Sequence, residues 1–184
     1  MDTSPMNLTS LDFLFETTPP WIYVGEGEPE RVKWIPSYFY SRPGLKVCTR
    51  KLRGWKMHST QDLMNEAGAA LQLFDGFGEN WHALEECLCY MDEWLPADAY
   101  VIVVEGVQEM LPGDLESLKS MLITFNLAGN FWSRGVDSPE RFRRDPAPFH
   151  LLLNVAEGHK SVIDLILNSA AESGVAIRTD PPQP

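Results

Sequence analysis

Residues 99–107 read A-Y-V-I-V-V-E-G-V, a nearly continuous apolar run. A strand with one solvated face alternates apolar and polar residues, whereas a strand covered on both faces of a parallel sheet does not. The run therefore predicts the central strand of a parallel sheet. Because both faces of such a strand must be covered, we expect helices on both sides of the sheet or a sheet enclosed between other layers.

Strands and helices alternate along the chain around this run. Apolar periodicity, capping residues and turn residues predict strands over 45–52, 149–155 and 175–179, and helices over 61–71, 81–94, 115–132 and 160–173. Such alternation implies βαβ crossovers and a small α/β domain. Residues 21–24 are expected to form an accessory strand, and residues 135–148, rich in proline and arginine, a loop.

Length and composition narrow the class of protein. A chain of 184 residues with 44% hydrophobic residues fits one domain with tails. There is no run of about 18 apolar residues and no signal-peptide pattern in residues 1–10, so we expect a cytoplasmic protein without a membrane span. The three cysteines, Cys48, Cys87 and Cys89, lack CxxC spacing and argue against a disulfide framework or a cysteine zinc site.

The net charge of −11 originates in one third of the chain. Residues 57–118 contain 13 Asp and Glu residues and no Lys or Arg, while the remainder carries 15 Lys and Arg against 13 acidic residues. Proteins bind nucleic acid through Lys and Arg that contact the phosphates. The excess of negative charge therefore argues against a nucleic-acid ligand and favours a basic partner. A solvated acidic surface that only maintains solubility explains the same charges.

Enzymatic motifs are absent from the sequence. It contains no GxGxxG at the start of a helix, no phosphate-binding GxxxxGK[ST], no GxSxG and no HExxH. His82, Glu85 and Glu86 could share a helix face and bind a metal, but no second cluster of His or Cys completes the ligand shell. Glu85 and Glu86 are disfavoured as an acid–base pair because adjacent helical residues point about 100° apart. We therefore expect no enzyme, no metal and no cofactor.

Residues 73–88 read L-F-D-G-F-G-E-N-W-H-A-L-E-E-C-L and resemble the barstar family, inhibitors of barnase-type ribonucleases. The preceding strand and helix and the run at 99–107 are similar to further elements of that family. The resemblance implies a barstar-like three-stranded parallel sheet packed with helices, over residues 45–155. Residues 1–44 are then an N-terminal extension, with 1–20 expected to be disordered, and residues 156–184 add a helix, a strand and a tail. A rival register assigns the last family helix to 160–173, with the segment before it inserted.

The resemblance also implies a binding surface. Family members lay the second helix and the loop before it over the basic groove of a ribonuclease, where a carboxylate takes the place of the substrate phosphate. Glu86 matches that carboxylate, and acidic neighbours are expected to steer and support the complex. The expected partner-binding residues are Asp75, Gly76, Gly78, Asn80, His82, Glu85, Glu86, Cys89, Asp92 and Glu93. The implied function is a 1:1 inhibitor of a basic ribonuclease or nuclease toxin, an immunity protein whose acidic helix 80–94 blocks the active site.

Three positions of the second helix differ from the family pattern, and an acidic residue of the family's third helix falls at Leu127 or at Asn168, depending on the register. His82 stands where the family has Asp, Glu85 where it often has an aromatic residue, and Glu86 where it has the shorter Asp. These differences favour a basic toxin other than barnase as the partner. The alternative hypothesis is a non-catalytic interaction module that keeps the fold and binds a non-nuclease partner, through the loop at 134–148 or the C-terminal addition.

Overall fold

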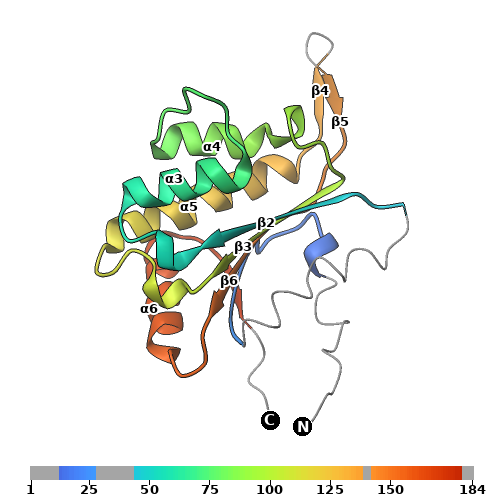
Figure 1. Cartoon of the computed structure of the whole chain (residues 1–184). Helices are drawn as coiled ribbons and strands as arrows, with labels where there is room; N and C mark the ends of the chain where they lie inside the picture. Colours follow the sequence, from blue (N-terminus) through green and yellow to red (C-terminus); the bar gives the residue numbers. More distant parts are fainter. Residues whose placement is uncertain (1–12, 28–43, 139–141, 180–184) are drawn as a thin grey trace.

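The computed structural model describes residues 13–27, 44–138 and 142–179 (Figure 1). Its centre is a five-stranded sheet of β1 (Ile22–Glu26), β2 (Val47–Arg53), β3 (Ala99–Glu105), β6 (Phe149–Val155) and β7 (Ile177–Thr179). The strands lie in the order β2-β3-β6-β1-β7, and all neighbouring pairs are parallel. Every residue of β3 is buried, which confirms the prediction of a central strand.

The helices α3 (Thr60–Leu71), α4 (Trp81–Cys89), α5 (Leu115–Trp132) and α6 (Lys160–Glu172) contribute to one core on one face of the sheet. The path of the chain explains this arrangement. From β2 to β3, β6 and β7 the chain moves across the sheet in one direction, and right-handed crossovers that move in one direction place their helices on the same face. Figure 1 shows α3, α4 and α5 stacked on this side.

The helix starts follow local sequence signals. The side chains of Ser59, Asn80 and Asp114 cap α3, α4 and α5 by accepting hydrogen bonds from backbone N–H groups in the first turn. At the end of α3, Gln72 adopts a left-handed conformation with φ of 56°. Short 3-10 turns, η2 (Gly54–Lys56), η3 (Met91–Glu93) and η4 (Val107–Glu109), complete the connections on this side.

The opposite face of the sheet carries a smaller core. Phe13 and Leu14, in a short 3-10 turn, pack on Val101 and Val103 of β3 and on Leu152 of β6. A second layer was expected over the central strand. In the part of the chain that the structure describes, this turn forms that layer, because all four helices lie on the other face. His150 of β6 is 1% exposed, and its Nε2 lies 3.1 Å from the carbonyl oxygen of Glu16.

The sheet is wider than the three strands that the resemblance implied. β1, expected as an accessory strand, pairs with β6 on one side and with β7 on the other, so β7 and β2 are the edge strands. Trp21, just before β1, is 1% exposed, and its indole Nε1 donates a hydrogen bond to Asn130 Oδ1 of α5 at 3.0 Å. Segments outside 45–155 thus contribute to the same sheet and the same core. The expected disorder of 1–20 falls mostly outside the described residues.

Two further expectations differ from the structure. The segment 135–148, expected to be a loop, contains a hairpin of β4 (Val136–Ser138) and β5 (Phe142–Arg144) that projects from the body in Figure 1. The second helix, expected to reach residue 94, ends at Cys89 and continues as η3. The backbone N–H of Tyr90 is shared between the carbonyls of Glu86 and Cys87 at 3.2 and 3.3 Å, and this tightening ends the α-helix.

Candidate partner-binding site

The loop that enters α4 is a tight, hydrogen-bonded turn. Its first half is closed by hydrogen bonds from Leu73 N–H to the Gly68 carbonyl at 2.9 Å and from Phe77 N–H to the Phe74 carbonyl at 3.0 Å. Gly76 has φ of 98°, a conformation that L residues with a Cβ rarely adopt. The backbone of this loop is therefore held in one shape without a partner.

Asn80 joins the loop to the helix through both ends of its amide. Its Oδ1 accepts a hydrogen bond from Ala83 N–H at 3.0 Å, and its Nδ2 donates one to the Gly78 carbonyl at 2.8 Å. A Cβ on Gly78 would lie 3.0 Å from Asn80 Nδ2 and 3.3 Å from Ala83 Cβ, so a larger residue here would push against the capping amide. Both residues were predicted to contact a partner, and the structure shows that they also shape the surface.

The helix α4 is fixed to the body of the protein by its apolar face. Leu84 and Leu88 are fully buried, and α4 packs along α5. The indole Nε1 of Trp132 donates a hydrogen bond to the Leu88 carbonyl at 2.8 Å. A helix held in this way loses little entropy when it docks, because it is already ordered.

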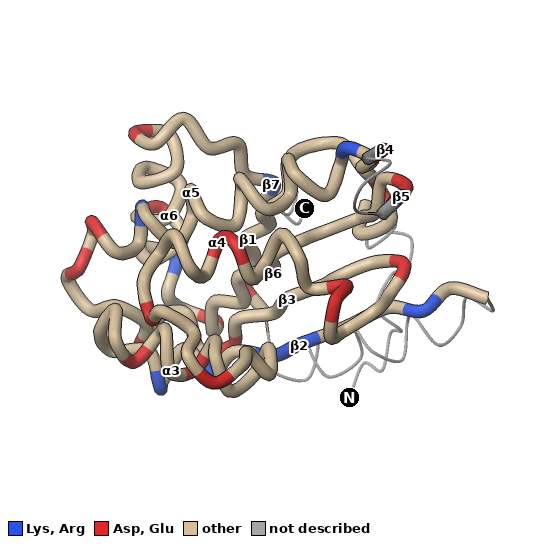
Figure 2. Tube along the Cα trace, turned by 90° about the horizontal axis from the view of Figure 1, so that it is seen from above, with Lys and Arg blue, Asp and Glu red and all other residues tan. Residues whose placement is uncertain are grey.

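The outward face of α4 is acidic and lacks basic neighbours. His82 and Glu86 are exposed and Glu85 is half-buried, with Asp75 exposed in the loop before the helix. In the described ranges, no Lys or Arg forms an ion pair with Asp75, Glu85 or Glu86. Figure 2 shows basic residues along β2 and none along α4. The carboxylates are thus available to a basic partner.

The structure separates the predicted residues at the end of the helix. Glu93 is exposed, and Asp92 has an Oδ1 3.8 Å from Arg144 Nη1 of the hairpin. Cys89, which the helical periodicity placed toward the polar face, is only 7% exposed and belongs to the core. Burial, and secondarily the charge of Glu85, raises the pKa of the Cys89 thiol to about 12. The prediction of Cys89 as a surface residue was wrong because the region of the hairpin covers this turn of α4.

Arg144 is the residue through which the hairpin holds the end of α4. Its side chain is 9% exposed, and the guanidinium carbon lies 3.8 Å from the ring centre of Trp132 and 4.7 Å from that of Phe131. Its Nη1 donates a hydrogen bond to the Cys89 carbonyl at 3.3 Å. Burial lowers the pKa of the guanidinium, and the Asp92 carboxylate opposes that shift. The sequence showed arginines in this segment but not that one of them is buried.

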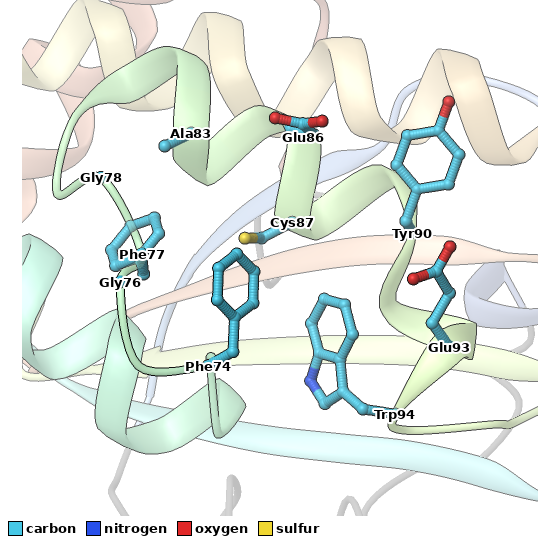
Figure 3. Close-up of a pocket in the computed structure, with 10 residues that line it drawn as sticks. All are labelled: Phe74, Gly76, Phe77, Gly78, Ala83, Glu86, Cys87, Tyr90, Glu93 and Trp94. Atoms are coloured by element: carbon cyan, nitrogen blue, oxygen red, sulfur yellow. The ribbon is translucent and has the colours of Figure 1, made fainter.

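A hollow of about 390 Å³ opens beside Glu86, between α4, the loop before it and η3 (Figure 3). Its walls include the aromatic residues Phe74, Phe77, Tyr90 and Trp94, and Glu86 and Glu93 contribute carboxylates. Gly76, Gly78, Ala83 and Cys87 complete the lining. None of the four aromatic residues was among the partner-binding residues predicted from the sequence. Phe74 directly precedes the Asp75-Gly76 turn and is 62% exposed. The Asp-Gly signal predicted the turn but not the exposure of this ring.

The fold and this surface define a small α/β protein that presents an acidic helix. The family comparison matches residues 47–154 with the family described as Barstar (barnase inhibitor). This match covers more than half of the chain, and the protein belongs to the barstar family, as the resemblance predicted. The match begins with β2 and ends in β6, so β1, α6 and β7 lie outside it.

Comparison with solved structures found a chain in "Structure of Drosophila ORC bound to AT-rich DNA and Cdc6", with 11% identity and a TM-score of 0.46. The alignment covers 93% of this chain and 51% of that one, so the protein spans about half the length of the matched chain. A similarity at this level carries no argument about fold or function. A comparison with curated proteins found no match.

Over the described ranges, no group of three or more His, Cys, Asp and Glu side chains is arranged to hold a metal ion. No helix in those ranges is long and apolar enough to cross a membrane.

Proposed function

We propose that the protein is a stoichiometric inhibitor of a basic ribonuclease or related nuclease toxin. It acts as a cytoplasmic immunity protein that forms a 1:1 complex and has no catalytic activity of its own. The loop at 73–80 and the helix α4 dock on the basic active-site groove of the nuclease, and Glu86 takes the place of a substrate phosphate. Membership of a family of barnase inhibitors supports the class of partner.

One observation carries the proposal: Glu85 and Glu86 stand on a rigid, capped helix with no basic ion-pair partner in the described parts of the chain. An active site that cleaves RNA gathers Arg, Lys and His around the phosphate. Carboxylates at the same points form charge-assisted hydrogen bonds with those groups, and the surrounding negative charge accelerates the encounter. Asp75, Glu93 and, more weakly, the paired Asp92 add to this field.

The test is capture of partners at low and at high salt, with wild type beside Glu86→Ala and Glu109→Ala. Glu109 is also exposed and acidic but lies in η4, far along the chain from α4, so it controls for the change in net charge. A captured nuclease is then titrated with each variant in a ribonuclease assay. We expect inhibition to be complete at one equivalent of wild type and of Glu109→Ala.

For Glu86→Ala we expect a loss of affinity of about 2 kcal/mol or more, the range of hot-spot residues in other interfaces. If only non-nuclease proteins are captured and the Glu86 substitution leaves their binding unchanged, the inhibitor proposal is wrong. In that case, joint substitution of the exposed Arg134 and Arg143 by alanine, which keeps the buried Arg144, tests the interaction-module hypothesis, which predicts loss of the captured partner.

A further inference from the structure

The hollow beside Glu86 has a chemical character of its own. Figure 3 shows the rings of Phe74 and Trp94 side by side beneath α4, with Glu86 above them and Glu93 to one side. Aromatic faces and carboxylates in one small space favour a cation that also has an apolar or planar surface. The two carboxylates disfavour a nucleotide, whose phosphates they would repel.

Trp94, Tyr90 and the backbone that carries Phe74 are held in place before anything binds. The indole Nε1 of Trp94 donates a hydrogen bond to the Leu71 carbonyl at 3.0 Å, which fixes the plane of its ring. Tyr90 packs edge-on against Phe131 of α5, with ring centres 5.3 Å apart. Phe74 is carried by the hydrogen-bonded turn that ends at Phe77. Binding therefore requires little reorganisation of the protein.

The charge of the hollow is uncompensated. Within the described residues, neither Glu86 nor Glu93 forms an ion pair with a Lys or Arg of the chain itself. The volume of about 390 Å³ is at the lower end of the range of small-molecule sites, a size suited to one long side chain. Arginine suits this space better than lysine, because its planar guanidinium stacks on aromatic rings and pairs with a carboxylate through two hydrogen bonds.

We propose that the hollow is a receptor for an arginine side chain that protrudes from the partner protein. The guanidinium stacks on the rings of Phe74 and Trp94 and pairs with Glu93, while the carboxylate of Glu86, which Figure 3 shows above α4 and away from these rings, faces the groove of the partner. This inference rests on the proposed function for the identity of the partner, but not for the chemistry of the hollow. In the complex, an arginine side chain of the partner then enters the hollow, while α4 blocks the active site of the partner.

The test uses the full chain and a blocked amino acid, N-acetyl-arginine amide, so it does not require the partner. Amide and indole N–H signals are followed by NMR during titration at constant ionic strength. Blocked citrulline, which has nearly the same shape without the charge, and blocked lysine are titrated in parallel. We expect saturable shifts confined to the signals of Phe74, Gly76, Glu86, Tyr90 and Trp94, with arginine binding more tightly than lysine and with no saturation by citrulline.

Phe74→Ala and Glu93→Gln should each weaken arginine binding about two- to fivefold, because each removes one exposed cation contact. Both side chains are exposed, so the fold should be retained, and the NMR spectrum of each variant verifies this. The matched controls are Leu165→Ala on α6, an exposed apolar side chain, and Glu109→Gln in η4. Both controls should bind arginine as wild type does.

Equal shifts with arginine and citrulline, shifts spread over the whole acidic surface, or unchanged binding in Phe74→Ala would overturn the inference. These results are independent of the proposed function. If the protein inhibits a nuclease while the hollow fails to select arginine, the proposal of an arginine receptor is wrong and the proposal of a nuclease inhibitor is supported. If the hollow selects arginine while the captured proteins are not nucleases, the proposal of an arginine receptor is supported and the proposed class of partner is wrong.

Discussion

Substitution of Gly129 by alanine tests whether the N-terminal segment is part of the core. Gly129 lies in α5 where the indole of Trp21 crosses the helix. A Cβ at this position would collide with Trp21 Cγ and would lie 2.7 Å from both Cβ and Cδ1 of that residue. Trp21 is 1% exposed and tied to Asn130 by its hydrogen bond, so it has little room to move aside.

The expected magnitude follows from two opposing effects. Alanine is favoured over glycine in a helix interior by up to about 1 kcal/mol. Inserting a methyl group into a well-packed core costs about 1–3 kcal/mol, and losing the packing of a buried Trp altogether costs about 3–5 kcal/mol. Because the collision with Trp21 Cγ displaces the indole, the larger cost applies, and we expect Gly129→Ala to lower the free energy of unfolding by about 2–4 kcal/mol.

The assay is urea unfolding followed by circular dichroism, with Gly68→Ala as the matched control. Gly68 lies in α3, and the nearest atom that its Cβ would meet is Phe77 Cδ1 at 3.9 Å, an ordinary contact distance. The control should thus be as stable as wild type or more stable by up to about 1 kcal/mol. In Gly129→Ala the urea midpoint should fall with the slope unchanged.

A double-mutant cycle identifies the cause. In a Trp21→Ala background, where the indole is absent, Gly129→Ala should cost much less than it does in wild type. A Gly129→Ala protein as stable as wild type would mean that Trp21 does not pack on α5. An equal cost in both backgrounds would locate the strain elsewhere.

Three further predictions concern pH and thiol chemistry. Burial lowers the pKa of His150 to about 4, so the free energy of unfolding should be highest above pH 6.5 and fall by about 3 kcal/mol between pH 6.5 and 4. In unfolding measured against pH, His150→Gln should remove most of this decrease, and an unchanged profile would contradict the burial of the imidazole. Hydrogen bonds from Arg53, at 2.8 Å to each carboxylate oxygen, lower the pKa of Glu66, whose side chain is 6% exposed. Glu66→Gln should lower the free energy of unfolding by about 1–3 kcal/mol at pH 7 and should lose less stability than wild type as the pH falls below about 4.5. Equal acid sensitivity of the two proteins would show that the pair is not formed. Cys48 is half-buried, whereas Cys89 is buried and has a raised pKa. A thiol reagent at pH 8 should therefore modify Cys48 first and Cys89 only on unfolding. Equal rates of modification of the two thiols would show that α4 opens readily.

Local signals in the sequence predicted most elements of the fold. Ser59 and Asn80 cap helices where they were expected, and the runs at 99–105 and 149–155 form buried parallel strands. These features depend on residues within a few positions of each other, and the composition of a short window is enough to identify them. The barstar family was recognisable for the same reason, because the loop at 73–80 and the start of α4 form one continuous motif.

Long-range contacts decided what the sequence did not predict. The place of β1 between β6 and β7 depends on pairing with residues more than 120 positions away, such as Leu151 with Ile22, and no local pattern encodes such a pairing. The candidate site divides in the same way. Its acidic residues and glycines were predicted from one stretch of sequence, whereas the aromatic walls of the hollow were not predicted.

The sequence by itself determined the class of fold, the helix with its carboxylates and the glycine turn before it, because helix caps, turns and apolar periodicity act over a few residues. Only the tertiary structure decided that Cys89 is buried beneath the region of the hairpin, and that Phe74, Glu86, Glu93 and Trp94 surround one hollow. A helical period gives the direction of a side chain but not what covers it. Cover is supplied here by Arg144, which reaches α4 from a segment 55 residues away from Cys89.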